Sequence, residues 1–171
     1  MTLKAPLPSG TVTLLFTDIE GSTQRWEEQS AAMSDALRRH DKLLRAAIEA
    51  HGGYVFKTMG DGFCAAFSRA SDAVAAGIDA QRALVAEDWG VAGGVGVRMA
   101  LHSGAVEERD GDYFGPAVNR VARILAIVHA GQIVVSETTA LLLRGVMPGQ
   151  TDLRDLGEHR LKDLAKPEHI W

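Results

Sequence analysis

Short β-rich apolar runs alternate along this chain with longer segments of helical spacing, and such alternation restricts the fold to a sheet covered by helices. The first run, residues 12–17, predicts a buried strand. Residues 31–50 carry apolar side chains at helical spacing, and two glycines then end the helix. Residues 54–56 and 63–67 flank a glycine-rich turn and predict a β-hairpin.

The second half of the chain continues this alternation. It predicts, in order, a helix over residues 68–88, a strand over 97–102, a loop over 111–115, a helix from Pro116 to about residue 129, a strand over 132–135, a short helix capped by Ser136, and short strands in the tail 153–171. The order favours an α/β (α+β) sandwich, in which helices cover a mixed, largely antiparallel sheet.

Composition narrows the class of protein. The chain has 171 residues, enough for one domain, and a formal net charge of −4, so neither nucleic acid nor an anionic membrane is an expected partner. Its single cysteine, Cys64, allows no disulfide within the chain, which suits a reducing compartment. No apolar run approaches the length of a membrane span. We therefore expect a cytoplasmic domain over residues 11–171, preceded by an N-terminal extension over residues 1–10.

The first strand ends at a carboxylate. Asp18 follows the apolar run directly, and Gly21, Ser22 and Thr23 come next as a turn and a helix N-cap. Backbone N–H groups at the beginning of a helix bind phosphate, because their dipoles favour negative charge. An aspartate before a helix N-terminus is nevertheless common in proteins without any such site.

A second carboxylate lies at the hairpin turn. Asp61 stands between Gly60 and Gly62, and glycines allow a ligand to approach the backbone closely. Two carboxylates at neighbouring strand ends suit Mg²⁺ or Mn²⁺, and they would repel each other without the metal. The alternative is an ordinary turn, since Gly-Asp-Gly is a frequent turn sequence. Spacing alone does not bring Asp18 and Asp61 together.

Two polar residues share one face of the helix that starts at Pro116. Asn119 and Arg123 are four positions apart, so they lie beside each other at the edge of its apolar stripe. A guanidinium beside an amide stabilises charge that develops on phosphate. The alternative is a solvated face without a catalytic role.

Four segments resemble, in order, the sequence motifs of class III adenylyl and guanylyl cyclases. They are residues 16–23 and 57–63, which resemble the two metal motifs, residues 114–123, which resemble the transition-state segment, and residues 156–162, which resemble the segment that carries a phosphate-binding lysine. The resemblance covers nearly the whole chain from about Thr11. It implies a ferredoxin-like or palm-like βαββαβ core.

The resemblance also implies a role for each matching residue. Asp18 and Asp61 would bind two Mg²⁺ or Mn²⁺ ions, with help from the backbone carbonyl of Ile19, and the turn formed by Gly21, Ser22 and Thr23 would hold phosphates. Lys57 and Asp112 would read the base. Asn119 would orient the ribose, Arg123 would stabilise the pentavalent phosphate, and Lys162 would bind the terminal phosphates.

Family members build this site between two subunits, so the resemblance implies a homodimer. The metal-binding aspartates would come from one subunit, and the residues that contact the base and the transition state would come from the other. The predicted activity is that of an adenylate cyclase, a lyase that converts ATP into cyclic AMP and pyrophosphate for signal transduction.

The residues at the base-reading positions favour ATP over GTP. Adenine offers an acceptor at N1 and a donor at N6, which match the Lys57 ammonium and the Asp112 carboxylate. Guanine presents the reverse pattern and would prefer Glu at position 57. A guanylate cyclase and a non-catalytic nucleotide-binding module remain as alternatives. A diguanylate cyclase does not fit, because residues 59–63 lack its Gly-Gly-Asp/Glu-Glu-Phe hairpin. Pro116 and Ala117 depart from a more polar pair common in relatives.

Overall fold

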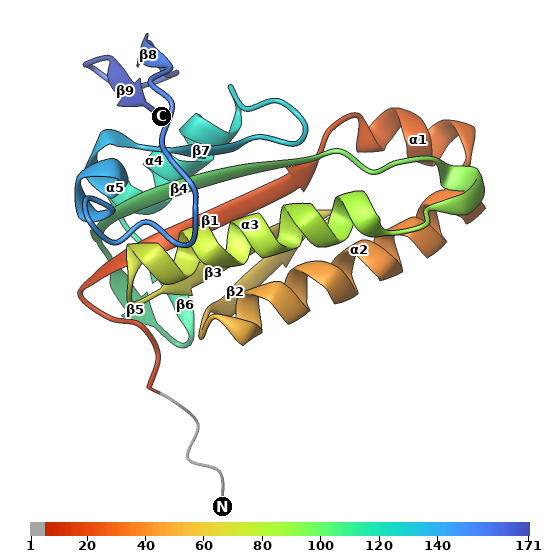
Figure 1. Ribbon diagram of the computed structural model, residues 1–171, viewed down its shortest axis with the longest axis horizontal. Helices are drawn as coiled ribbons and strands as arrows, with labels where there is room; N and C mark the ends of the chain where they lie inside the picture. Colours follow the sequence, from red (N-terminus) through yellow and green to blue (C-terminus); the bar gives the residue numbers. More distant parts are fainter. Residues whose placement is uncertain (1–5) are drawn as a thin grey trace, which may run out of the picture.

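A five-stranded sheet lies at the centre of the computed structural model, which describes residues 6–171 (Figure 1). Its strand order is β2-β3-β1-β4-β7. The two long central strands, β1 (Thr11–Ile19) and β4 (Val97–Ala105), pair antiparallel over their full length. The strands β3 (Gly62–Phe67) and β2 (Tyr54–Met59) extend the sheet beyond β1 as an antiparallel hairpin, and β7 (Ile133–Val135) is added parallel to β4.

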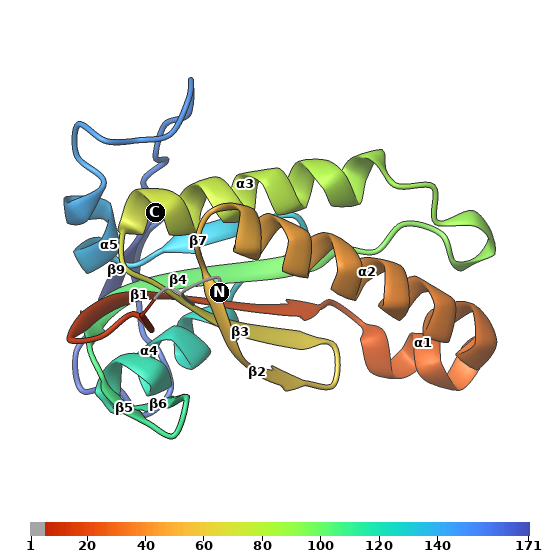
Figure 2. The ribbon, with the colours of Figure 1, turned by 90° about the horizontal axis from the view of Figure 1, so that it is seen from below.

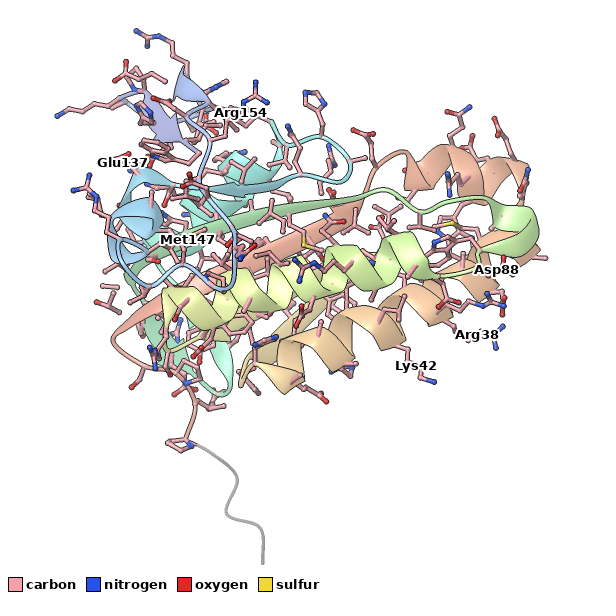
Figure 3. All side chains as sticks on the ribbon, viewed as in Figure 1. Arg38, Lys42, Asp88, Glu137, Met147 and Arg154 are labelled. Carbon is pink, nitrogen blue, oxygen red and sulfur yellow. The ribbon has the colours of Figure 1, made fainter. Side chains whose placement is uncertain are left out.

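Helices cover the two faces of this sheet unequally. The long helices α2 (Ser30–Ala50) and α3 (Ala70–Ala86) cover one face, and the shorter α4 (Pro116–Leu125) covers part of the other (Figure 2). Side chains of β1 alternate accordingly. Leu15 packs with the cluster under α2 and α3, whereas Leu14 and Phe16 pack with the cluster under α4. On the outer face of α2, Arg38 and Lys42 point away from the sheet (Figure 3).

Smaller elements complete the described part of the chain. These are α1 (Ser22–Glu28), a 3₁₀ turn (Gly90–Ala92), β5 (Glu107–Arg109), β6 (Asp112–Phe114), α5 (Glu137–Leu142), β8 (Gly157–His159) and β9 (Glu168–Ile170). The tail is fixed to the sheet, because Trp171 and Val135 exchange two backbone hydrogen bonds of 2.9 and 3.0 Å.

The predicted fold class is confirmed. The order β1-α2-β2-β3-α3-β4 is the expected βαββαβ core, and the sheet is mixed and largely antiparallel. Ser136 caps α5 as expected, since its side chain accepts a hydrogen bond from the amide of Thr139. No helix within residues 6–171 has the length and apolar character that crossing a membrane requires.

Three local predictions were wrong. Residues 112–114 form β6 rather than part of a loop, because β5 offers a pairing partner whose exposed polar side chains carry no apolar pattern. The helix α4 ends at Leu125 rather than near residue 129, although the buried Val128 continues its apolar spacing into the next turn. The helix α1 begins after Gly21 as its N-cap, and no side chain caps it.

The first five residues of the predicted N-terminal extension lie outside the described residues. Residues 6–10 form neither helix nor strand, yet they contact the domain. The Tyr113 hydroxyl donates to the Pro8 carbonyl at 2.7 Å, and the Val106 amide donates to the Gly10 carbonyl at 3.0 Å. The boundary at Thr11 coincides with the first residue of β1 and stays a prediction as a domain limit.

Candidate active site

The end of β1 and the β2–β3 turn bring the two predicted metal-binding aspartates to the same end of the sheet. The backbone amide of Ile19 donates a hydrogen bond to Oδ2 of Asp61 at 3.0 Å. A Cβ atom at Gly62 would lie only 2.9 Å from the carbonyl oxygen of Thr17, so glycine at this position allows the turn to approach β1. The fold thus brings Asp61 close to the end of β1, next to Asp18, which sequence spacing alone did not predict.

Arg98, which the sequence motifs did not single out, lies in this site. It stands directly opposite Asp18 in the β1–β4 register, and its guanidinium donates two hydrogen bonds to the Asp18 carboxylate, at 2.6 and 2.5 Å. These hydrogen bonds raise the pKa of Arg98. Both side chains are about one-quarter exposed. A charged residue in an otherwise apolar strand was the signal available in the sequence.

The ion pair between Arg98 and Asp18 corrects the expectation that, without metal, Asp18 is simply repelled by Asp61. Asp18 is neutralised by Arg98 and not simply repelled by Asp61, so its removal leaves a half-buried guanidinium without a partner. We expect removal of the Asp18 carboxylate to cost about 1–3 kcal/mol of folding free energy. A substitution of Asp61 is therefore the better test of metal binding, because it leaves the Arg98–Asp18 pair intact.

The donor chemistry of this site fits a divalent metal that arrives with its substrate. Within residues 6–171, no three His, Cys, Asp or Glu side chains form a metal-binding group. Mg²⁺ is often held by one or two carboxylates together with substrate phosphates rather than by an all-protein cage. Asp18 and Asp61 match that pattern, and Arg98 supplies a second cation for a phosphate.

The turn after β1 has the predicted position but a different cap. Gly21 adopts a left-handed conformation, with φ near 70°, that glycine accommodates without strain. No side chain caps α1, so the amides of Ser22 and Thr23 lie at an uncapped helix N-terminus beside Asp18. Such amides suit an anion.

Lys57 and Asp112, the predicted base-reading residues, contact each other. The Lys57 ammonium lies 2.7 Å from Oδ2 of Asp112, from β2 to β6. Their mutual hydrogen bond raises the pKa of Lys57 and lowers the pKa of Asp112, so both are charged at neutral pH. A base edge does not fit between two groups at this distance, so binding of a base between them requires the pair to separate.

Apolar and aromatic groups lie beneath this pair. The rings of Phe56 and Tyr113 meet edge to face with centroids 4.9 Å apart, and Cys64 lies opposite Lys57 in the β2–β3 register. Burial raises the pKa of the Cys64 thiol to about 11, so it is a neutral packing residue. The charged groups of Lys57 and Asp112 therefore lie beside apolar and aromatic side chains.

The helix α4 presents Asn119 and Arg123 on its outer side. Arg123 donates a hydrogen bond of 2.7 Å from one terminal nitrogen to Oδ2 of Asp163, in the tail. Lys162, the residue directly before Asp163 in that tail, is exposed. A neighbouring ion pair between Arg120 and the buried Glu168 also joins α4 to the tail. Folding thus places Lys162 near Arg123, which spacing did not predict.

The candidate residues form separate groups within one chain. Among residues 6–171, no hydrogen bond or ion pair joins Asn119 or Arg123 to Asp18 or Asp61. A Cβ atom at Gly104 would lie 3.0 Å from Cβ of Ala117, and Gly104 pairs with Val12. The beginning of α4 is therefore about 20 Å along β1 from Asp18, from six residues at roughly 3.3 Å each.

On the sheet face that carries Asp18, no helix covers the half of the sheet near the end of β1. Side-chain alternation in β1 places Asp18 on the same face as Leu14 and Phe16, toward α4. Figure 2 shows α4 under the part of the sheet near the start of β1, while the end near the β2–β3 turn has no helix beneath it. This open surface bears the aspartates, Arg98 and Lys57.

Comparison with known proteins identifies relatives of this chain. The family model for the adenylate and guanylate cyclase catalytic domain matches residues 5–170. An uncharacterized protein of Mycobacterium tuberculosis is 42% identical over 165 residues, which are 95% of this chain. An adenylate cyclase of Podospora anserina is 30% identical over an alignment that covers 98% of this chain. The structure of an adenylate cyclase from Trypanosoma brucei, described in its monomeric state, superposes with a TM-score of 0.89 at 26% identity and covers 97% of this chain and 90% of that one.

These relatives differ from the chain in length. The chain spans 55% of the Mycobacterium tuberculosis protein and 10% of the Podospora anserina enzyme. The likeness therefore concerns one domain of larger proteins.

Proposed function

Because the chain belongs to the family of adenylate and guanylate cyclase catalytic domains, we propose that it is an adenylate cyclase that converts ATP into 3′,5′-cyclic AMP and pyrophosphate. The observation that carries the choice of ATP is the pair formed by Lys57 and Asp112. The Lys57 ammonium is a donor and the Asp112 carboxylate is an acceptor, and the two lie together beside apolar side chains. They complement adenine, whose N1 accepts and whose N6 donates.

The triphosphate is bound at the end of β1. Asp18 and Asp61 would hold two divalent ions, Mg²⁺ or Mn²⁺, with the carbonyl of Ile19 as a further ligand. When bound, these ions lower the pKa of the attacking hydroxyl and neutralise the leaving group. With the Asp18 carboxylate engaged by metal, Arg98 would be free to donate part of its hydrogen bonds to a phosphate. The amides of Ser22 and Thr23 bind a further phosphate oxygen.

The chemical step closes a ring on the α-phosphate. The ribose 3′ oxygen forms a bond to the α-phosphorus and loses its proton to solvent water. The bond from that phosphorus to the bridging oxygen breaks, and pyrophosphate leaves with both electrons. Asn119 orients the ribose, Arg123 donates hydrogen bonds to the charge that develops on the α-phosphate, and Lys162 binds the terminal phosphates. No residue here forms a covalent intermediate.

The active enzyme is a homodimer in this proposal. In each site Asp18 and Asp61 would come from one copy, and the base-reading pair Lys57 and Asp112 would come from the other copy together with Asn119 and Arg123 of α4. The beginning of α4 and the metal-binding end of β1 lie apart within one chain. A two-fold arrangement places α4 of each copy over the open face of the other and creates two equal sites. The single buried Cys64 supports a reducing, cytoplasmic location.

The direct test is turnover by the purified chain with ATP or GTP and Mn²⁺. We expect cyclic AMP and pyrophosphate in equal amounts, with a specificity constant for ATP at least about tenfold above that for GTP. The matched control is Asp61→Asn, which keeps an acceptor for the Ile19 amide but removes the charge. It should lower turnover at least about a hundredfold without loss of thermal stability.

Other outcomes identify the alternatives. A preference for GTP would make the domain a guanylate cyclase. Nucleotide binding without product would make it a non-catalytic module. Product formation that Asp61→Asn leaves unchanged would exclude the β1 site as the metal centre.

A further inference from the structure

Asp163 occupies a backbone conformation that its residue type rarely adopts. Its φ is 63°, in the left-handed region, and it follows Lys162 in a tight turn closed by a hydrogen bond from the Leu164 amide to the Leu161 carbonyl at 3.2 Å. A turn with positive φ at its third position normally carries glycine or asparagine there. An aspartate in that place is strained, and strain of this kind persists where it serves a function.

The carboxylate at this strained position reaches a catalytic candidate. Oδ2 of Asp163 accepts a hydrogen bond of 2.7 Å from one terminal nitrogen of Arg123. This is a single contact, whereas the Arg98 guanidinium gives two to Asp18. Arg123 therefore keeps its other N–H donors for a phosphate, because a guanidinium has five.

The turn itself is held against the domain. Leu161 at its beginning is buried in the cluster under α4, and the chain beyond it is tied to the sheet through Trp171. The indole of Trp171 also donates to the carboxylate of Glu137 at 2.6 Å, in the region where Figure 3 shows Glu137 beside the tail. Asp163 consequently reaches Arg123 from a fixed base.

From this geometry we infer that Asp163 is a positioning residue, which holds the guanidinium of Arg123 in place and fixes Lys162 beside it, so that two cations meet the phosphates of a nucleoside triphosphate together. The inference rests on the proposed function. It adds a residue that makes no contact with the substrate. Its effect is to reduce the freedom of a long side chain before the reaction, which matters because small misplacement of a catalytic group is costly.

The decisive variant is Asp163→Gly, because glycine relieves the positive φ while removing the carboxylate. A purely structural role for the Asp163 carboxylate predicts a lower thermal stability of Asp163→Gly and unchanged kinetics. Positioning predicts equal or higher stability together with a kcat lowered about ten- to a hundredfold and a KM for ATP changed much less. Asp163→Asn, which suits this turn position better than aspartate and keeps an oxygen acceptor, should retain part of the kcat that Asp163→Gly loses.

A matched control comes from the other described non-glycine residue with positive φ. Asp110, with φ of 54°, lies in the turn between β5 and β6 and makes no ion pair with an arginine. Asp110→Gly relieves the same kind of strain and should leave kcat unchanged. An equal loss of kcat in this control would overturn the inference, because relaxation of any turn would then explain the effect.

A second measurement does not depend on turnover. NMR of the arginine side chains reports rotation about the Nε–Cζ bond, which should be slow for Arg123 and at least about threefold faster in Asp163→Gly, since a hydrogen bond restrains the guanidinium. Equal rotation rates, or an unchanged kcat in an active enzyme, would overturn the inference. If the unaltered chain made no cyclic AMP while Arg123 was restrained by Asp163, the proposed function would fail and the restraint itself would stand.

Discussion

Lys57 and Asp112 are the residues on which the proposed choice of ATP depends. Separately, each is an exposed or half-exposed charge of the kind that usually has no role. Together they offer a donor and an acceptor 2.7 Å apart, and the pair fixes both protonation states. Each of the two charges is satisfied by the other when no base is bound. This contact limits the free-energy cost of holding the proposed base-reading pair at an open surface.

Reversal of donor and acceptor should reverse the nucleotide preference. Guanine donates from N1 and N2 and accepts at O6, so Lys57→Glu with Asp112→Asn supplies an acceptor and a donor in the matching places. Each misplaced hydrogen bond to a base edge costs about 1–3 kcal/mol, so the ratio of specificity constants for ATP and GTP should fall by about a hundredfold or more. Steady-state kinetics on both nucleotides measure this ratio.

The single change Lys57→Glu is the informative comparison, because it places two carboxylates together and should weaken both nucleotides. An unchanged ratio in the double variant would show that other residues read the base.

Among the elements, β1, β4 and α5 are joined by a buried chain of polar side chains. The hydroxyls of Thr13 and Ser103 lie 2.8 Å apart, that of Ser103 lies 2.9 Å from Thr139, and Nδ1 of His102 lies 2.7 Å from the hydroxyl of Ser136. Burial lowers the pKa of His102 to about 4, and the charge of Arg120 acts in the same direction. The neutral imidazole is therefore part of the packing between sheet and helix.

This histidine should make folding stability depend on pH. Its unfolded pKa is 6.5, so between pH 6.5 and about 4 the unfolded chain binds a proton that the folded chain excludes. Stability should accordingly fall as pH falls through this window, by about 3 kcal/mol from this residue alone. Urea unfolding at several pH values, compared with His102→Asn, measures the contribution as a difference in slope. Parallel pH profiles for the two proteins would contradict it.

At the scale of the whole molecule, the separation of functional groups within one chain has a sharp consequence. If the enzyme is the proposed homodimer, Asp61→Ala should remove metal binding from both of its sites, and Arg123→Ala should remove the stabilising guanidinium from both. In a mixed dimer of the two variants, one site carries both defects and the other carries neither. With free exchange, half of the dimers are mixed and half of their sites are intact, so activity should recover to about a quarter of the unaltered enzyme.

The measurement is cyclic AMP production against mixing ratio, with subunit exchange followed independently by fluorescence energy transfer. Recovery no greater than the average of the two variants would show that Asp61 and Arg123 serve one site within a single chain. The protein concentration has to be high enough to hold dimers together.

The sequence by itself determined the layered fold and the chemistry of most candidate residues. Period-two and helical spacing of apolar residues specify strands and helices, and burial then assembles them into one βαββαβ sheet. The motifs around Asp18, Asp61 and Arg123 could be recognised in the sequence, because each places a charged residue directly beside an apolar run or a glycine turn. The strands β5 and β6 were missed, because each has only three residues, too few to show an apolar pattern in the sequence.

Only the tertiary structure decided which of these residues meet. The contacts of Arg98 with Asp18, of Lys57 with Asp112, and of Arg123 with Asp163 join positions 40 to 80 residues apart. Strand register, turn conformation and the docking of the tail set these contacts, and each is a property of packing between distant segments. Local sequence therefore determines the chemical properties of a side chain, while the fold determines which partner it contacts.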